Sequence, residues 1–119
     1  MQVRTFLFLK KGGIGMDQRK CPVVEIIEVI GGKWKIPILW CIGQSGTIRY
    51  NELKREVTGI TNIMLTRSLD SLIKHKLVTR KDFRTIPLKV EYSLTENGEA
   101  LFPLLKQLVT WIKGVEIVN

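Results

Sequence analysis

The sequence predicts an α+β fold that is mainly helical and has one small β-hairpin. Three observations lead to this class. Residues 46–94 read in order as a short strand, two helices joined by a turn, and two strands rich in β-branched and aromatic residues. Residues 96–115 carry a separate apolar pattern with helical spacing. The length of 119 residues allows one domain.

Two further helices are predicted before this region. Pro22 suits the first position of a helix and Gly31-Gly32 would end one, so we expect a helix over residues 22–29. The apolar run of residues 36–42 is too short to cross a membrane and predicts a core helix. Pro37 fits there if the helix begins near Trp34, because a proline in the first turn removes few hydrogen bonds.

The two central helices have recognisable ends. Asn51 is predicted to cap the first helix, Gly59 to end it, and Thr61 to cap the second. Within the second, residues 61–76, the apolar spacing predicts one buried face made of Leu65, Leu69, Leu72 and Ile73. The opposite face then carries Asn62, Ile63, Thr66, Arg67, Asp70 and Lys74. Most of these side chains can bind a base edge or a phosphate, but taken alone they fit an ordinary solvated surface equally well.

The predicted hairpin pairs residues 77–84 with residues 89–94. Arg84 and Lys89 stand on either side of its tip. Pro87 stiffens the tip and removes a donor that a central strand would need. A stiff, cationic tip of this kind suits a phosphate backbone.

At this point the chain resembles the HxlR-type winged helix-turn-helix transcriptional regulators, which are related to the MarR group. The matching motifs are Cys21-Pro22, Gly31-Gly32-Lys33-Trp34, Arg49-Tyr50-Asn51-Glu52-Leu53, Gly59-Ile60-Thr61, Met64-Leu65-Thr66, Leu77-Val78-Thr79-Arg80, Pro87, Val90-Glu91-Tyr92-Ser93-Leu94-Thr95, Gly98 and Trp111. The resemblance implies a three-helix core with a wing and a C-terminal dimerisation helix. It also implies a homodimer that regulates transcription by binding specific double-stranded DNA.

Composition supports a nucleic-acid partner independently. The formal net charge is +8 and the pI is about 9.8, which favours a polyanion. The basic residues cluster around the two central helices and the hairpin, so we rank a membrane surface below DNA. The expected DNA-binding residues are Lys54, Arg55, Thr61, Asn62, Ile63, Thr66, Arg67, Asp70, Lys74, Arg80, Arg84, Thr85 and Lys89. Arg80 could point inward or toward the minor groove. The alternative function is a winged helix that binds another protein without reading DNA.

The last helix is more apolar than one core contact requires, which predicts pairing with a second copy of the chain. The expected dimer interface is Val23, Ile26, Leu104, Leu108, Trp111, Ile112 and Val115. Residues 1–16 fall outside the resemblance and are expected to precede the domain of residues 17–119, either as an arm or as a stretch upstream of a true start at Met16. They do not resemble a signal peptide, and we expect a cytoplasmic protein.

Cys21 is the candidate for sensing an oxidant or a small-molecule effector. It should precede Pro22 at the start of a helix, where the helix dipole favours a thiolate and Arg19 and Lys20 add positive charge. A cysteine that merely packs or caps the helix is an equally good explanation. Cys41 lies in an apolar run and should be a buried, inert thiol.

Enzymatic chemistry finds little support in the sequence. His75 stands between two lysines near a predicted helix end, where a cation complements the helix dipole. The spacing of Cys21, Cys41 and His75 does not match a zinc site. We therefore expect no cofactor, no metal and no catalytic residue.

Overall fold

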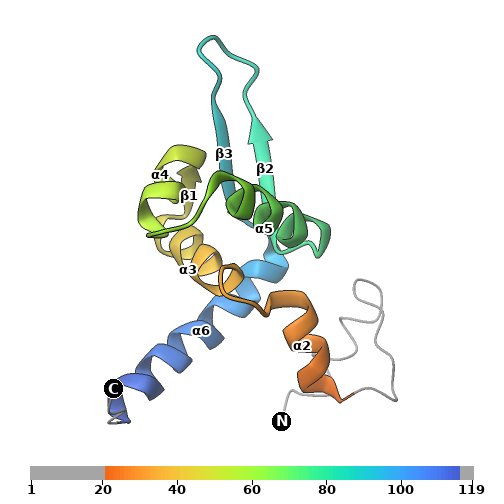
Figure 1. Cartoon of the computed structure of the whole chain (residues 1–119), viewed down its shortest axis with the longest axis vertical. Coiled ribbons are helices and arrows are strands. Elements are labelled where there is room, and N and C mark those ends of the chain that lie inside the picture. The colour runs from red at the N-terminus through yellow and green to blue at the C-terminus, as the bar shows by residue number, and fades with distance from the viewer. Residues whose placement is uncertain (1–20, 116–119) are drawn as a thin grey trace.

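Five helices and a three-stranded antiparallel sheet make up residues 21–115, the part of the chain that the computed structural model describes (Figure 1). The helices are α2 (Pro22–Ile30), α3 (Lys35–Ser45), α4 (Tyr50–Glu56), α5 (Asn62–Lys74) and α6 (Glu96–Gly114). The strands are β1 (Thr47–Arg49), β2 (Val78–Asp82) and β3 (Val90–Leu94). The predicted α+β class is confirmed. The proposed arm of residues 1–16 lies outside the described residues.

The core forms where α3, α4, α5 and the base of the sheet meet. Its most deeply buried side chains are Ile38, Leu39, Ile42, Leu53, Leu65, Leu69, Leu72 and Val78. Burial of each such side chain stabilises the fold by about 1.5–3 kcal/mol before entropy is counted. The predicted face of α5 is confirmed, with Ile73 only half-buried and Ser68 buried beside the leucines.

The connection between α4 and α5 follows from two residues. Gly59 has φ +88°, a left-handed conformation that glycine adopts without strain, and it turns the chain between the helices. Thr61 caps α5 as predicted, because its Oγ1 accepts a hydrogen bond of 3.1 Å from the backbone N–H of Met64.

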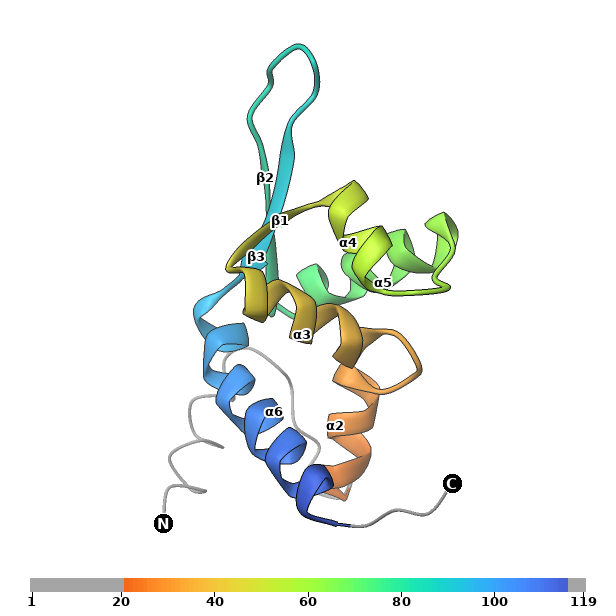
Figure 2. The ribbon, with the colours of Figure 1, turned by 90° about the vertical axis from the view of Figure 1, so that its left-hand side faces the viewer.

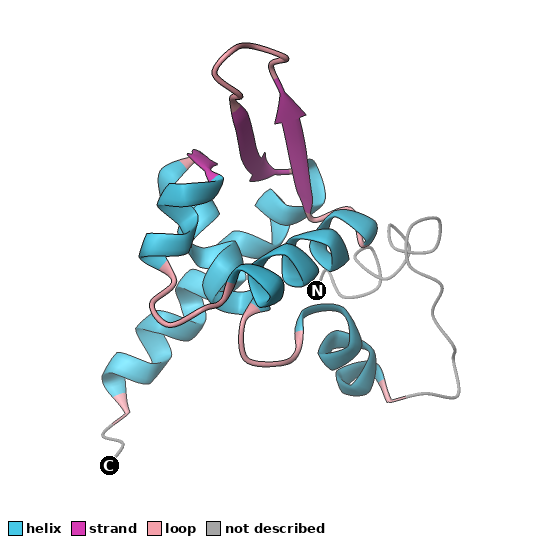
Figure 3. Ribbon diagram, turned by 45° about the horizontal axis from the view of Figure 1, so that its top comes forward, coloured by secondary structure: helices cyan, strands magenta, loops and turns pink. Residues whose placement is uncertain are grey.

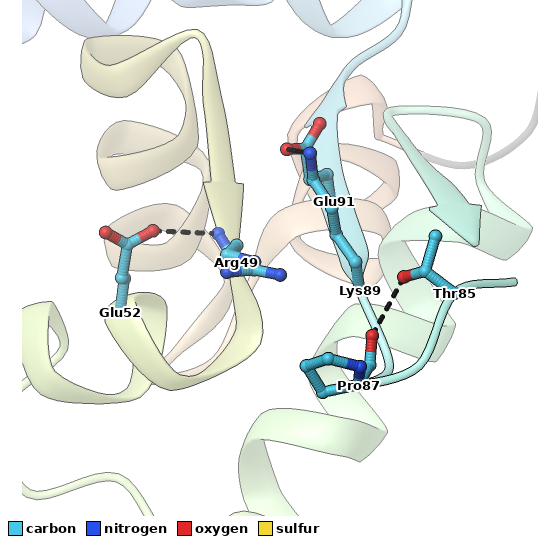
Figure 4. Close-up of polar contacts among 6 residues, drawn as sticks. All are labelled: Arg49, Glu52, Thr85, Pro87, Lys89 and Glu91. Carbon is cyan, nitrogen blue, oxygen red and sulfur yellow. Dashed lines mark hydrogen bonds and ion pairs between the residues drawn. The ribbon is translucent and has the colours of Figure 1, made fainter. Parts of the chain in front are cut away.

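The predicted cap at the start of α4 is wrong. Asn51 lies inside the helix, because β1 runs directly into α4 and Arg49 occupies the cap position. Glu52 Oε1 accepts the backbone N–H of Arg49 at 3.2 Å (Figure 4). The Glu52 carboxylate, on the third residue of α4, therefore provides the capping hydrogen bond at the start of the helix that was expected from Asn51.

The sheet has the strand order β1-β3-β2, with Arg49 opposite Glu91 and Arg80 opposite Tyr92. We call β2, β3 and the loop between them the wing (residues 78–94). β2 ends earlier than predicted, because the Asp82 carboxylate accepts the backbone N–H of Arg84 at 2.8 Å and turns the chain there. The wing projects far from the helical body (Figure 2).

The first and last described helices lie on the side opposite the wing. In two views, α2 and α6 both run away from the body while the wing points the other way (Figures 1 and 2). α6 begins at the cap residue Thr95, whose Oγ1 accepts the N–H of Gly98 at 3.1 Å, and continues through Pro103. No helix within residues 21–115 is long and apolar enough to cross a membrane.

Candidate nucleic-acid interface

The outer surface of α5 carries a straight row of exposed side chains. Ile63, Arg67, Asp70 and Lys74 follow one another at spacings of four, three and four residues, which places them on one face of the helix. Ile63 is 64% exposed although it is apolar. α5 lies across the helical body with the wing rising beyond it (Figure 3). The row is therefore open to a large partner.

Asn62 and Thr66 form a second, shorter row on the edge of α5 that meets α4. The Tyr50 hydroxyl, on the first residue of α4, lies 3.2 Å from Asn62 Oδ1 and 3.3 Å from Thr66 Oγ1. It is also 3.3 Å from the backbone oxygen of Asn62. Two of the predicted base-reading residues thus share one tyrosine.

A groove of about 720 Å³ separates the first turn of α4 from the wing. Three arginines line it, one from the end of β1, one from α4 and one from β2: Arg49, Arg55 and Arg80. The remaining lining residues are Tyr50, Asn51, Glu52, Pro87, Leu88, Val90 and Tyr92. Figure 4 shows the Arg49 side chain extending from β1 toward the wing. A groove with three guanidinium groups and one carboxylate is suited to an anion.

The outer surface of the wing carries further cations. The ammonium groups of Lys81 and Lys89 lie 4.8 Å and 4.4 Å from the centre of the Phe83 ring. Lys89 also forms an ion pair of 3.7 Å with Glu91 (Figure 4). At the tip, the Thr85 hydroxyl donates to the Pro87 carbonyl at 2.8 Å. The charge of Lys89 is therefore partly engaged within the protein.

Most of the residues expected to bind DNA are accessible in the structure. Eleven of the thirteen are exposed, and Lys54 and Lys89 are half-buried. The side chain of Arg80 is exposed and lines the groove, so it does not point into the core. Sequence reasoning missed Arg49, Tyr50 and Lys81. The register of β1 against β3 is what places Arg49 beside the wing, and no local pattern encodes that register.

Two apolar surfaces remain uncovered on the opposite side of the molecule. The residues expected at a dimer interface are all exposed, from 39% to 59%: Val23, Ile26, Leu104, Leu108, Trp111, Ile112 and Val115. They belong to α2, to α6 and to the residue that follows α6. An isolated small domain gains nothing by exposing so much apolar surface.

The two cysteines have different surroundings. Cys21 is exposed and occupies the cap position of α2, but its side chain makes no capping hydrogen bond. Cys41 is half-buried, and its pKa is raised, first by burial and then by the nearby Glu56 carboxylate. A raised pKa lowers the thiolate fraction, which makes Cys41 the less reactive thiol.

Within residues 21–115 no three His, Cys, Asp or Glu side chains lie close enough to hold a metal ion. Nδ1 of His75 donates to the Ser71 carbonyl at 3.0 Å, at the C-terminal end of α5. His75 therefore caps a helix end.

A family model described as HxlR-like helix-turn-helix matches residues 29–116. The chain belongs to this family. Among related proteins, this HxlR-like chain is 48% identical over 96 residues to the HTH-type transcriptional regulator YkvN of Bacillus subtilis, a match that spans 81% of this chain and 80% of YkvN. It is 44% identical over 106 residues to the regulator YtcD of the same organism, spanning 87% of this chain and 82% of YtcD.

Solved structures show the same fold. The redox regulator HypR in its oxidized form is similar with a TM-score of 0.74 and 40% identity, over 82% of this HxlR-like chain and all of that one. The reduced form of the transcriptional regulator YodB from B. subtilis has a TM-score of 0.66 and 29% identity, over 77% of this chain and 90% of that one. The fold is that of the winged-helix, MarR-like regulators, and the role of the chain is regulation of transcription, not catalysis.

Proposed function

We propose that this chain is a homodimeric regulator that binds a specific sequence of double-stranded DNA. The observation that carries the proposal is the exposed row on α5, which lies next to a groove with three arginines and a basic wing. Many side chains that can bind bases thus lie beside many that can bind phosphates, on one side of a chain with net charge +8. The domain of residues 17–119 and a cytoplasmic location are parts of the same proposal.

In this binding mode α5 enters the major groove. Arg67 donates two parallel hydrogen bonds to a guanine edge, and the exposed Ile63 contacts a thymine methyl group. Asn62 and Thr66 read a neighbouring base. Asp70 and Lys74, farther along the row, reach a base amino group and the backbone.

The phosphates are held on both sides of α5. Arg55 and Arg80 line the groove with Arg49, and Lys54 lies on α4 beside it. Thr61 and the first backbone N–H groups of α5 suit a phosphate as well, since a helix N-terminus attracts anions. The wing contacts the adjacent DNA backbone through three residues: Arg84, Thr85 and Lys89.

The homodimer is proposed to form through α2 and α6. Both helices lie on the side opposite the wing (Figure 2), and both carry exposed apolar residues, so pairing through them would leave both DNA-binding surfaces free. A twofold dimer also gives the two equivalent half-sites that such regulators require, one turn of DNA or about 34 Å apart.

Cys21 is proposed to sense oxidants or another electrophilic effector. The solved relatives include a redox regulator, HypR, in oxidized and reduced forms, and YodB after treatment with diamide. Cys21 is exposed, lies next to the proposed dimer surface of α2, and forms no capping hydrogen bond. Modification there would move α2 against its partner and change the spacing of the two α5 helices.

A mobility-shift assay on a random DNA pool tests the proposal. The parent protein should retain a subset of sequences at moderate salt in the presence of excess competitor DNA. Complete loss of the complex to competitor would favour the alternative, in which the basic surface binds an acidic protein. Sequencing of the retained DNA would give the binding site.

A further inference from the structure

The side chain of Tyr50 connects the two helices of the DNA-binding unit. Its ring packs against the hydrophobic core, while its hydroxyl reaches α5 at residues 12 and 16 positions later in the chain. Tyr50 also lines the arginine groove. Tyr50 therefore lies between the residues proposed to read bases and those proposed to bind phosphates.

The hydrogen bonds of the hydroxyl can be assigned from the groups around it. A tyrosine hydroxyl has one proton to donate and lone pairs that accept. The neighbouring Asn62 oxygens, Oδ1 at 3.2 Å and the backbone oxygen at 3.3 Å, can only accept, so the proton of Tyr50 points to them. Thr66 Oγ1, at 3.3 Å, then donates its own proton to the Tyr50 oxygen.

These hydrogen bonds determine which donor and acceptor groups α5 presents to a partner. With Oδ1 of Asn62 held by Tyr50, the two N–H donors of the exposed Asn62 amide remain available to a partner. Thr66, with its proton used, offers lone pairs. Without the tyrosine hydroxyl the Asn62 amide could rotate and present either oxygen or nitrogen.

We propose that Tyr50 is a positioning residue for base recognition, which fixes Asn62 so that its amide donates to an acceptor on a base in the major groove. The base edges that fit are those with an acceptor in the major groove, such as N7 of a purine, O6 of guanine or O4 of thymine. The inference rests on the proposed function, because it assumes that α5 reads base edges.

Tyr50→Phe tests the role of the hydroxyl while keeping the ring in the core. Affinity for the selected site should fall roughly fivefold, the size of one net hydrogen bond. Affinity for random DNA and its dependence on salt should stay the same, because no phosphate contact is lost. The control is Ser45→Ala, which removes an exposed hydroxyl from the last residue of α3, outside α5 and the groove, and should leave affinity and site preference unchanged.

Repeating the site selection with Tyr50→Phe shows at which base position the Tyr50 hydroxyl affects the sequence preference. The preference should weaken at one base position in each half-site, the same position that weakens in Asn62→Ala. The two substitutions combined should cost little more than Asn62→Ala alone, since they act through one contact. Should Tyr50→Phe fold poorly, the same selection on Asn62→Leu serves, because leucine is close to asparagine in shape, removes the amide donor and adds no charge that would repel phosphates.

The outcomes separate the inference from the function on which it rests. A parent protein that binds selected and random DNA equally would contradict the proposed function. A parent with clear preference that Tyr50→Phe retains in full would overturn the positioning role alone. An equal loss for selected and random DNA would also overturn it, because it would indicate a general effect on binding.

Discussion

Gly98, in the first turn of α6, packs directly against the backbone carbonyl of Leu77, the residue just before the wing. A Cβ atom at residue 98 would lie 2.2 Å from that oxygen and 3.1 Å from Cβ of Leu94. The same Leu77 carbonyl accepts the backbone N–H of Thr95 at 3.0 Å. The start of α6 is thus held against the base of the wing by backbone contact.

Gly98→Ala should therefore destabilise the protein. In an open helix position alanine is favoured over glycine by up to about 1 kcal/mol, but here the added carbon overlaps backbone that cannot move aside. We expect a loss of about 1–3 kcal/mol in the free energy of unfolding, measured by urea denaturation. Gly114→Ala is the control, since nothing lies within 4 Å of a Cβ there, and it should be neutral or stabilising. Equal stability of Gly98→Ala and the parent would contradict the packing described.

Lys89 and Glu91 form an ion pair, and substitutions of the two residues should change DNA affinity in opposite directions. Lys89→Ala should weaken binding to all DNA sequences alike and reduce the salt slope by roughly 1, as expected for one lost phosphate contact. Glu91→Gln should strengthen binding and steepen the slope, because it releases the ammonium group that lies 3.7 Å away. Fluorescence anisotropy over a salt series measures both. A sequence-dependent effect of Lys89→Ala would show that the residue reads bases instead.

The exposed apolar surface of α6 predicts the assembly. Leu108→Asp should convert a dimer to a monomer, because it places a charge in the middle of an apolar interface. The matched control is Ile86→Asp at the fully exposed wing tip, which should leave the mass unchanged. Light scattering at micromolar concentrations distinguishes the two. A parent protein with the mass of one protomer would rule out the dimer.

The contrast between the two cysteines predicts where an oxidant acts. Mild oxidation should change the DNA affinity of the parent and of Cys41→Ser, but not of Cys21→Ser. The raised pKa of Cys41 keeps it a thiol at neutral pH, and the thiolate is the reactive form. A response that persists in Cys21→Ser, or is absent from the parent, would remove the support for a sensor at this position.

Much of the fold could be predicted because its signals are local. Thr61 and Pro22 mark helix starts through their own side chains, and the spacing of Leu65, Leu69 and Leu72 determines which face of α5 is buried. The wrong prediction for Asn51 shows where local sequence signals fail. A capping residue is recognised by type, but β1 leads into α4 two residues earlier, so that Arg49 is the cap residue and Glu52 provides the hydrogen bond.

The parts of the site that were missed depend on contacts between distant segments. Arg49 reaches the wing only because β1 pairs with β3, and Tyr50 meets Asn62 only because α4 crosses α5. Neither the strand order nor the crossing angle leaves a pattern in the neighbouring residues. The row on α5 could be predicted because it lies within one helix.

The most direct measurement of the central proposal is the ratio of affinities for a selected site and for scrambled DNA of the same length, at physiological salt. Sequence-specific recognition through α5 predicts a ratio of at least about 10³ for the parent. Arg67→Ala should lower the affinity for the selected site by about 1–3 kcal/mol and flatten the preference at one base position. Equal affinity of the parent for the two DNAs, unchanged by Arg67→Ala, would contradict sequence-specific recognition through α5.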